Sequence, residues 1–182
     1  YNYNLFEYSD AGTYGDFTFY SLHKNFPFKN GGMVVQNNSD ILQADFSKIK
    51  LLNNFSADLL NYNVKAIADK RNENFRIYDE LFQNIKGIQP LKKLTEGDIP
   101  HTYPILVDNG LREKLYFWLI DRNITLIALY YRLIPALQIE KYAKMHKISN
   151  DILNLPLHQD IDVENINEIV RLLKEGVTYL KQ

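Results

Sequence analysis

The sequence predicts an α/β protein in which a strand hairpin is followed by a small α/β sandwich domain. Three observations lead to this prediction. Two β-prone stretches near the start are joined by a glycine-containing loop, a long amphipathic helix follows, and the rest of the chain alternates between strand-like and helical patterns. Alternation of this kind is typical of sheets covered by helices.

The hairpin is predicted from residues 15–20 and 33–36. The first stretch is rich in β-formers, with aromatic side chains at Phe17 and Phe19, so we expect it to be a buried strand. The second stretch is short and apolar. Between them, a proline and the Asn30-Gly31-Gly32 sequence indicate a turn, so a tight loop joins the two strands.

A long helix is predicted next. Ser56 is a suitable N-cap, because its hydroxyl oxygen accepts a bond from the first turn. Gly87, which adopts a left-handed conformation easily, is expected to end the helix. Arg71 interrupts the apolar face, which recurs at helical spacing. That face comprises Leu60, Val64, Ile67, Phe75, Tyr78, Phe82 and Ile85.

A strand over residues 101–107 and a helix over residues 111–122 are predicted next. The helix should turn Leu115, Leu119 and Ile120 toward the core. Trp118 lies beside these residues and is expected to be buried, as tryptophan usually is.

Two further strands and a final helix complete the chain. Residues 124–130 are strongly apolar and β-prone, and residues 152–157 form a short strand. Asp162 is expected to cap the last helix. The apolar stripe of that helix comprises Val163, Ile166, Ile169, Val170, Leu173 and Val177.

Composition excludes several classes of function. The 182 residues are 46% hydrophobic and 24% charged, with a formal net charge of −1, so no basic surface for nucleic acid is expected. The absence of cysteine excludes disulfides and thiol catalysis, and four scattered histidines predict no metal site. No stretch has the length of a membrane span or the pattern of a signal peptide, so we expect a cytoplasmic protein without a membrane partner. Because Tyr1 follows no methionine and leads directly into strand-like sequence, we expect a piece of a longer chain.

Lys24 and Ser21 are the candidate site residues. A lysine at the end of an aromatic strand is a candidate nucleophile, since burial of an ammonium favours the neutral amine, which condenses with aldehydes. Ser21, three residues earlier, could donate a hydrogen bond to a phosphate, and the glycine pair would let backbone approach a ligand. From spacing alone, a solvated lysine and an ordinary turn explain the pattern better. A Ser-x-x-Lys acyl-transfer enzyme is another interpretation, although its companion motifs are missing.

Residues 15–32 resemble the cofactor-lysine region of the DegT/StrS-type sugar aminotransferases, which are similar to aspartate aminotransferase (fold type I). In that pattern Gly-Asp and an aromatic strand precede a serine, the Schiff-base lysine and a Gly-Gly hairpin. Other stretches resemble the same family in the same order, so the resemblance covers nearly the whole chain. They are Lys70-Arg71 and residues 100–107, 122–125 and 152–161.

The resemblance implies a chemistry for each matching residue. Lys24 would form the Schiff base with pyridoxal 5'-phosphate and then act as acid and base, and Ser21 would hold the phosphate. Residues 1–55 would be the C-terminal part of the large, cofactor-binding domain, and residues 56–182 the connecting helix and small C-terminal domain. The family implies a homodimer that transfers an amino group, with glutamate as donor, to a nucleotide-linked keto-sugar in polysaccharide biosynthesis.

The chain departs from the family pattern at three places. The aspartate for the pyridine nitrogen would lie before the first residue, so we expect this chain alone to bind the cofactor weakly and to be inactive. No Gly-x-Asn-x-Arg segment occurs between Gln43 and Asn63, and residues 130–135 replace Tyr-Pro-x-Pro-x-His. Dehydratase relatives carry histidine in place of the lysine, which Lys24 argues against. Two other readings are a non-catalytic fragment and a two-layer α/β domain that binds an unidentified ligand.

Overall fold

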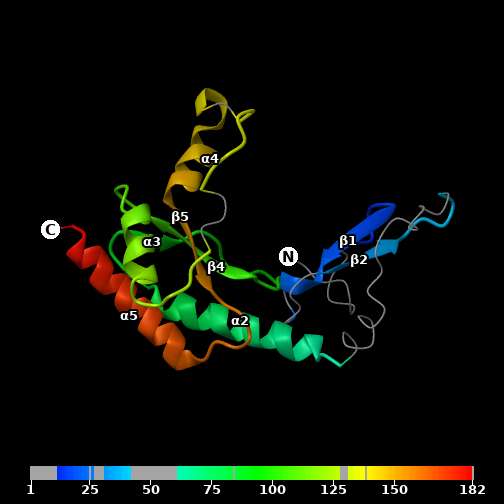
Figure 1. The fold of residues 1–182 in the computed structure, drawn as a ribbon, viewed down its shortest axis with the longest axis horizontal. Helices are drawn as coiled ribbons and strands as arrows, with labels where there is room; N and C mark the ends of the chain where they lie inside the picture. The colour runs from blue at the N-terminus through cyan, green and yellow to red at the C-terminus, as the bar shows by residue number, and fades with distance from the viewer. Residues whose placement is uncertain are drawn as a thin grey trace. The chain divides into compact units, whose positions relative to one another are not determined.

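A computed structural model describes residues 12–24, 26, 31–41, 61–83, 85–127, 131–137 and 139–181. The chain divides into two compact units. Unit 1 comprises Tyr1–Asp69 and Glu96–Ile99, and unit 2 comprises Lys70–Thr95 and Pro100–Gln182. The α/β class predicted from the sequence is confirmed (Figure 1). The domain boundary predicted between residues 55 and 56 lies outside the described residues.

Unit 1 contains the predicted hairpin. Strands β1 (Phe17–Ser21) and β2 (Gly32–Gln36) pair antiparallel, with Ser21 opposite Gly32. The connection is not the tight loop that we predicted, because it contains a 3-10 turn, η1 (Leu22–Lys24). The prediction of a buried strand is also wrong, since the Phe19 side chain is 76% exposed. The described part of unit 1 holds only these two strands, and neighbouring side chains on a strand point to opposite faces, so only one face is packed.

Helix α2 (Val64–Leu81) is the predicted long helix. The side-chain oxygen of Asn63 accepts a bond from the backbone N–H of Ala66 at 3.0 Å and caps the first turn, whereas Ser56 lies outside the described residues. The helix ends at Leu81 and not at Gly87. Gly87 does adopt a left-handed conformation (φ +89°), but it does so in the turn before the next strand. Four members of the predicted stripe are buried, namely Val64, Phe75, Tyr78 and Phe82. Ile67 and Ile85 are half-buried, and Leu60 lies outside the described residues.

Unit 2 is built on a three-stranded antiparallel sheet in the order β3-β4-β5. These strands span Ile88–Pro90, Thr102–Val107 and Ile152–Pro156. In the central strand β4, alternate side chains are buried, as expected for a strand with one core face. The strand predicted over residues 124–130 is wrong in its described part, where Ile127 forms a single bridge to Asn154.

Three more helices belong to unit 2. They are α3 (Arg112–Ile120), α4 (Ile139–Asp151) and α5 (Val163–Tyr179), of which α4 was not predicted. Helices α3 and α5 lie side by side (Figure 1), and Gly176 of α5 allows the close approach. Leu115 and Leu119 are fully buried, but Ile120, also placed on the inner face by the prediction, is 37% exposed.

Asp162 caps α5 as predicted. Its carboxylate accepts from the Asn165 N–H at 2.7 Å, and the Asn165 side chain accepts from the Asp162 N–H. This reciprocal pair satisfies two backbone donors that the helix cannot satisfy itself. The predicted apolar stripe of α5 is buried except at Val163.

The core of unit 2 contains an aromatic group that joins α2 to the sheet. The ring of Tyr78 stacks on Tyr103 of β4 at 4.8 Å between centroids, and Phe75 and Phe82 contact the same Tyr103 ring. Trp118 is only partly buried against this core, which corrects the prediction of full burial. Among the helices in the described ranges, none has the length and apolarity needed to cross a bilayer.

Candidate functional site

The turn that carries Lys24 is anchored by its own apolar residue. Leu22, the first residue of η1, is 1% exposed and packs with Phe26 and Val64 in the core of unit 1. The Phe26 N–H donates to the Leu22 carbonyl at 3.1 Å, which continues the turn. Burial of Leu22 therefore fixes the backbone from which the neighbouring polar side chains extend.

Ser21 and Lys24 lie on the two sides of Leu22 in sequence. Ser21 is the last residue of β1 and is exposed, and Lys24 ends η1 and is half-buried. Lys24 therefore follows Ser21 by three residues, with the buried Leu22 between them. His23 is exposed, and no chemistry was predicted for it. This stretch thus carries a primary amine and a hydroxyl, the two groups that attachment of a phosphorylated aldehyde would use.

The glycine pair opposite Ser21 has a structural explanation. Gly31 has φ +115°, a backbone conformation that residues with a side chain rarely adopt. A Cβ on Gly32 would lie 2.7 Å from the Tyr20 carbonyl oxygen across the hairpin. Hairpin geometry alone therefore requires these glycines, and close approach of a ligand is not needed to explain them.

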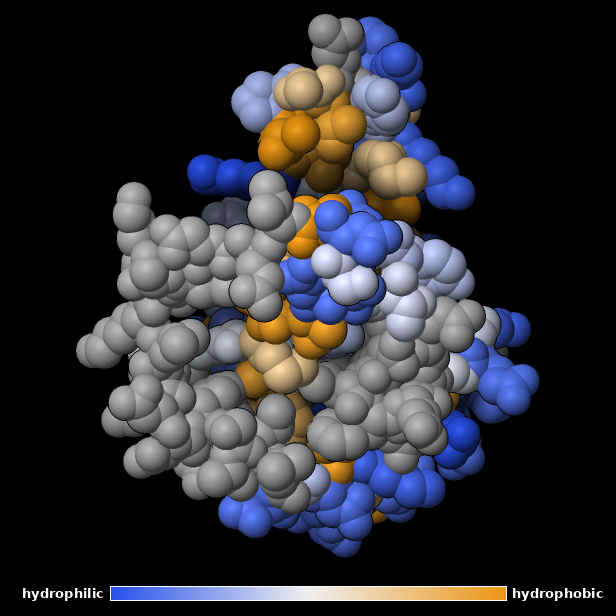
Figure 2. All heavy atoms as spheres, turned by 90° about the vertical axis from the view of Figure 1, so that its right-hand side faces the viewer, coloured by the Kyte–Doolittle hydropathy of each residue, from blue (hydrophilic) through white to orange (hydrophobic). Residues whose placement is uncertain are grey.

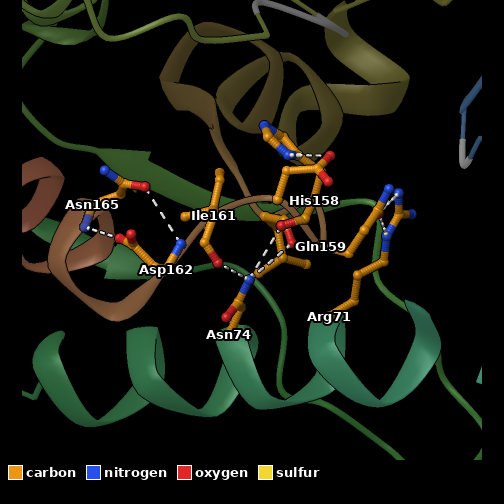
Figure 3. Close-up of polar contacts among 9 residues, drawn as sticks. Arg71, Asn74, His158, Gln159, Ile161, Asp162 and Asn165 are labelled. Atoms are coloured by element: carbon orange, nitrogen blue, oxygen red, sulfur yellow. Dashed lines mark hydrogen bonds and ion pairs between the residues drawn. The ribbon is translucent and has the colours of Figure 1, made fainter. Parts of the chain in front are cut away.

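A second polar site lies in unit 2, between α2 and the segment after β5 (Figure 3). Arg71 is 2% exposed, and its Nε and Nη2 donate to Gln159 Oε1 at 3.1 and 3.0 Å. One turn along α2, the Asn74 amide nitrogen lies within 3.5 Å of three backbone carbonyls, those of Leu157, His158 and Ile161. The helix thus holds the segment 157–161 through side-chain donors.

This arrangement joins two stretches that the sequence analysis had singled out separately, Lys70-Arg71 and residues 152–161. Sequence reasoning treated Arg71 as a break in an apolar stripe and missed Asn74 and Gln159. The signal was present, because a polar residue at a buried helical position needs a hydrogen-bond partner. His158 contacts Asp160 at 3.4 Å, and both side chains are exposed.

Candidate metal ligands do not gather in the described part of the chain, where no group of three or more His, Asp or Glu side chains could hold an ion.

An anchored lysine and serine on a hairpin, followed by a long helix and a small α/β unit, are the features expected of a fold type I enzyme. A family model for the DegT/DnrJ/EryC1/StrS aminotransferase family matches residues 50–174. The chain belongs to this family.

Solved structures support the same fold. The putative sugar aminotransferase Spr1654 from Streptococcus pneumoniae, in its PLP form, aligns with a TM-score of 0.73 at 19% identity, covering 93% of this chain and 53% of that one. PseC from Helicobacter pylori, an aminotransferase involved in the biosynthesis of pseudoaminic acid, aligns with a TM-score of 0.69 at 19% identity, covering 93% and 55%. CalS13 from Micromonospora echinospora, a sugar aminotransferase, gives a TM-score of 0.66 at 16% identity, covering 91% and 53%.

The chain therefore spans a little over half the length of these three structures. Spr1654 is also similar in its PMP form, with a TM-score of 0.71. Comparison with curated proteins gives no match.

Proposed function

We propose that this chain is the C-terminal half of a pyridoxal-phosphate-dependent sugar aminotransferase and that Lys24 carries the cofactor. The observation that supports the proposal best is the turn anchored by buried Leu22, which carries Lys24 three residues after Ser21. Family membership supports the reaction class. The PLP and PMP forms of Spr1654 support the cofactor.

The two residues fit the covalent attachment of this cofactor. Lys24 is half-buried, and the buried side chain of Leu22, two residues earlier, anchors the turn that carries it. Ser21 is exposed and can donate its hydroxyl proton to a phosphate oxygen. When bound, pyridoxal phosphate supplies an electron sink for the carbanion formed in transamination.

Lys24 has two roles in this proposal. Its Nζ attaches the cofactor, and, once released by the incoming amine, the same nitrogen takes and returns the proton at the reacting carbon. Ser21 limits rotation of the bound group by holding its phosphate.

The acceptor that we propose is a nucleotide-linked keto-sugar, and the donor is glutamate. Sugar aminotransferases among the similar structures support a sugar acceptor. We propose further that the whole protein is a cytoplasmic homodimer that serves polysaccharide biosynthesis.

The test is borohydride reduction of the whole protein that carries this chain, after incubation with pyridoxal phosphate, followed by peptide mapping. We expect the label on Lys24. Lys24→Arg should fold normally, take up no label and lose transamination, because a guanidinium cannot replace the amine. Label on a different lysine, or unchanged turnover in Lys24→Arg, would contradict the proposal.

A non-catalytic role for the isolated 182-residue chain is the second candidate, because the chain spans only about half of its structural relatives. In that case the chain alone binds pyridoxal phosphate weakly and gives no turnover with glutamate and a nucleotide keto-sugar. Titration followed by absorbance would test this, and stoichiometric binding with turnover would rule it out.

A further inference from the structure

Helix α4 and the loop before it, both in unit 2, combine exposed apolar side chains with exposed basic ones. Among the apolar residues, Ile134 is 65% exposed, Met145 47% and Tyr131 45%. An arginine of the loop and two lysines of α4 are exposed as well. We call this set the α4 surface, which consists of Tyr131, Arg132, Ile134, Lys141, Lys144 and Met145.

The loop is attached to the helix, so the two parts of the α4 surface lie close together. The Leu137 N–H donates to the Ile134 carbonyl at 3.0 Å, which closes a turn. The Leu137 carbonyl in turn accepts from His146 Nε2, next to Met145, at 2.6 Å. Helix α4 extends away from α3 and α5 (Figure 1), and Figure 2 shows apolar side chains at the top, over α4 and the loop, beside strongly hydrophilic ones. The α4 surface is therefore open to a large partner.

The same region carries an excess of positive charge. Residues 131–151 contain four Lys or Arg and two Asp or Glu, a net charge of +2 in a chain whose net charge is −1. One of the two acids, Asp151, is engaged by Lys147 at 2.6 Å, and the other is the exposed Glu140. Within the described part of the chain, none of the three cations of the α4 surface forms an ion pair. These cations attract an anionic partner.

Two of the cations lie over tyrosine rings. The guanidinium carbon of Arg132 is 5.4 Å from the centroid of the Tyr131 ring, and Lys141 Nζ is 5.6 Å from that of Tyr142. Tyrosine, lysine and arginine together are typical of protein segments at the headgroup level of a membrane. Tyrosine has an apolar ring and a polar end, and long basic side chains reach the phosphates while their stems stay on apolar surface.

We propose that the α4 surface binds the face of an anionic lipid bilayer. Ile134 and Met145 enter the boundary between headgroups and acyl chains, and the cations face the lipid phosphates. The sequence-based expectation of no membrane partner rested on the lack of a spanning segment. Peripheral binding does not require such a segment, so the α4 surface replaces that expectation with contact on one leaflet.

Other anionic partners fit these residues less well. A nucleic acid offers phosphates to the cations but no apolar layer to the exposed Ile134 and Met145. A stable protein partner covers about 800 Å² on each side with a rigid, complementary surface. The apolar side chains here are few and stand on a protruding loop and helix, to which a fluid bilayer adapts without a matching shape.

The test is co-sedimentation of the 182-residue chain with vesicles of phosphatidylcholine that contain roughly one third phosphatidylglycerol, and with vesicles of phosphatidylcholine alone. We expect binding to the anionic vesicles that weakens as salt is added, and much weaker binding to the neutral ones. Lys141→Gln/Lys144→Gln should weaken binding about 25-fold, since each cation near an anionic surface contributes about fivefold. Ile134→Ser should weaken it about tenfold, because the inserted apolar side chain is lost.

Matched controls come from exposed residues of the other helices. Arg76→Gln/Lys174→Gln removes two cations from α2 and α5, and Phe117→Ser removes a 56% exposed apolar side chain from α3. Both should bind vesicles as the parent chain does, and far-UV circular dichroism shows whether each variant keeps its fold. Lys24→Arg should also bind normally, so the α4 surface and the proposed catalytic lysine are tested separately.

Three results would overturn the inference. The first is no binding to anionic vesicles, and the second is equal binding to neutral ones. The third is equal weakening by the control variants. If soluble poly-glutamate binds with the same dependence on Lys141 and Lys144 while the vesicles do not bind, the α4 surface serves an acidic protein and the bilayer assignment is wrong.

Discussion

Arg71 and Gln159 are 88 residues apart in sequence, yet two nitrogens of the Arg71 guanidinium donate to the one side-chain oxygen of Gln159. The arginine is almost completely buried, so stabilisation of its charge depends on this contact and on its other local partners. The segment after β5 is thereby attached to the middle of α2. The stability of unit 2 should depend on this attachment.

Arg71→Ala should lower the free energy of unfolding by about 2–4 kcal/mol, because the buried alkyl stem and the charged hydrogen bonds are both lost. Urea unfolding followed by circular dichroism measures this. Arg76→Ala, an exposed arginine on the same helix, should change it by less than about 0.5 kcal/mol. Similar losses in the two variants would contradict the role given to Arg71.

Asn74→Ala should destabilise unit 2 by about 1–3 kcal/mol, since buried carbonyls of the segment 157–161 lose their donor. Asn74→Asp should be worse at neutral pH, because a carboxylate would face carbonyl oxygens without a proton to donate. Thermal unfolding shows which of the two variants is less stable, and Glu80→Ala serves as an exposed control on α2. A more stable Asp variant would show that the carbonyl contacts are unimportant.

Gly176→Ala should destabilise the packing of α3 against α5 by about 1–3 kcal/mol. An added Cβ would lie 2.7 Å from Leu115 Cδ1 and Trp118 Cδ1, and this clash should outweigh the gain in helix propensity of about 1 kcal/mol. Tryptophan fluorescence should change with it, since Trp118 is the only tryptophan. Thr178→Ala, an exposed change on α5, should leave both stability and emission as they are.

Tyr78 and Tyr103 should stay protonated at pH values where exposed tyrosines ionise. Burial raises the pKa of both phenols, and the hydrogen bond from Tyr103 to Asp79 at 2.7 Å raises the pKa of Tyr103 further. Because the folded-state pKa is above the unfolded value, their contribution to stability is complete below about pH 10 and is lost as the pH rises above it. Absorbance titration should show late ionisation together with unfolding. Tyr103→Phe removes one of these late groups, and an unchanged titration curve would contradict the assignment.

Asp162→Ala should cost about 1 kcal/mol, because the first turn of α5 loses the oxygen that accepts the Asn165 N–H. Urea unfolding measures the loss. Glu164→Ala changes an acidic residue of the same turn outside the capping pair and should cost less. If the two variants are equally stable, the cap has no energetic role.

The elements with regular patterns were predictable from the sequence. Most of the α2 stripe, the strand β4 and the acidic cap of α5 follow from local rules and were found, although α2 ends at Leu81 and not at Gly87. Helix α4 was not predicted; it is rich in charged and polar residues, and its backbone departs from helical geometry at Tyr142. The apolar character of the stretch 124–127 is explained by its packing near β5. Within this stretch, Ile127 forms a single bridge to Asn154 of β5.

The assignment of Ser21 and Lys24 as site residues stays a prediction. The order of Ser21 and Lys24 along the chain showed which residues to consider, but not that buried Leu22 would hold the turn between them. The contacts of Asn74 and Gln159 join residues that are distant in sequence. No local pattern encodes such pairings, so they required the structure.

The sheet of unit 2 has little capacity to recruit a foreign strand. On one side, β3 has three residues and ends in Pro90, which has no N–H to offer to an incoming chain. On the other side, the Ile127 bridge and the bond from the Asn154 side chain to the Ile127 carbonyl occupy part of the edge of β5. Open sheet edges are common starting points for aggregation, and short or covered edges reduce that risk. Unit 2 should therefore resist edge-to-edge polymerisation, even at the high concentrations reached during overexpression.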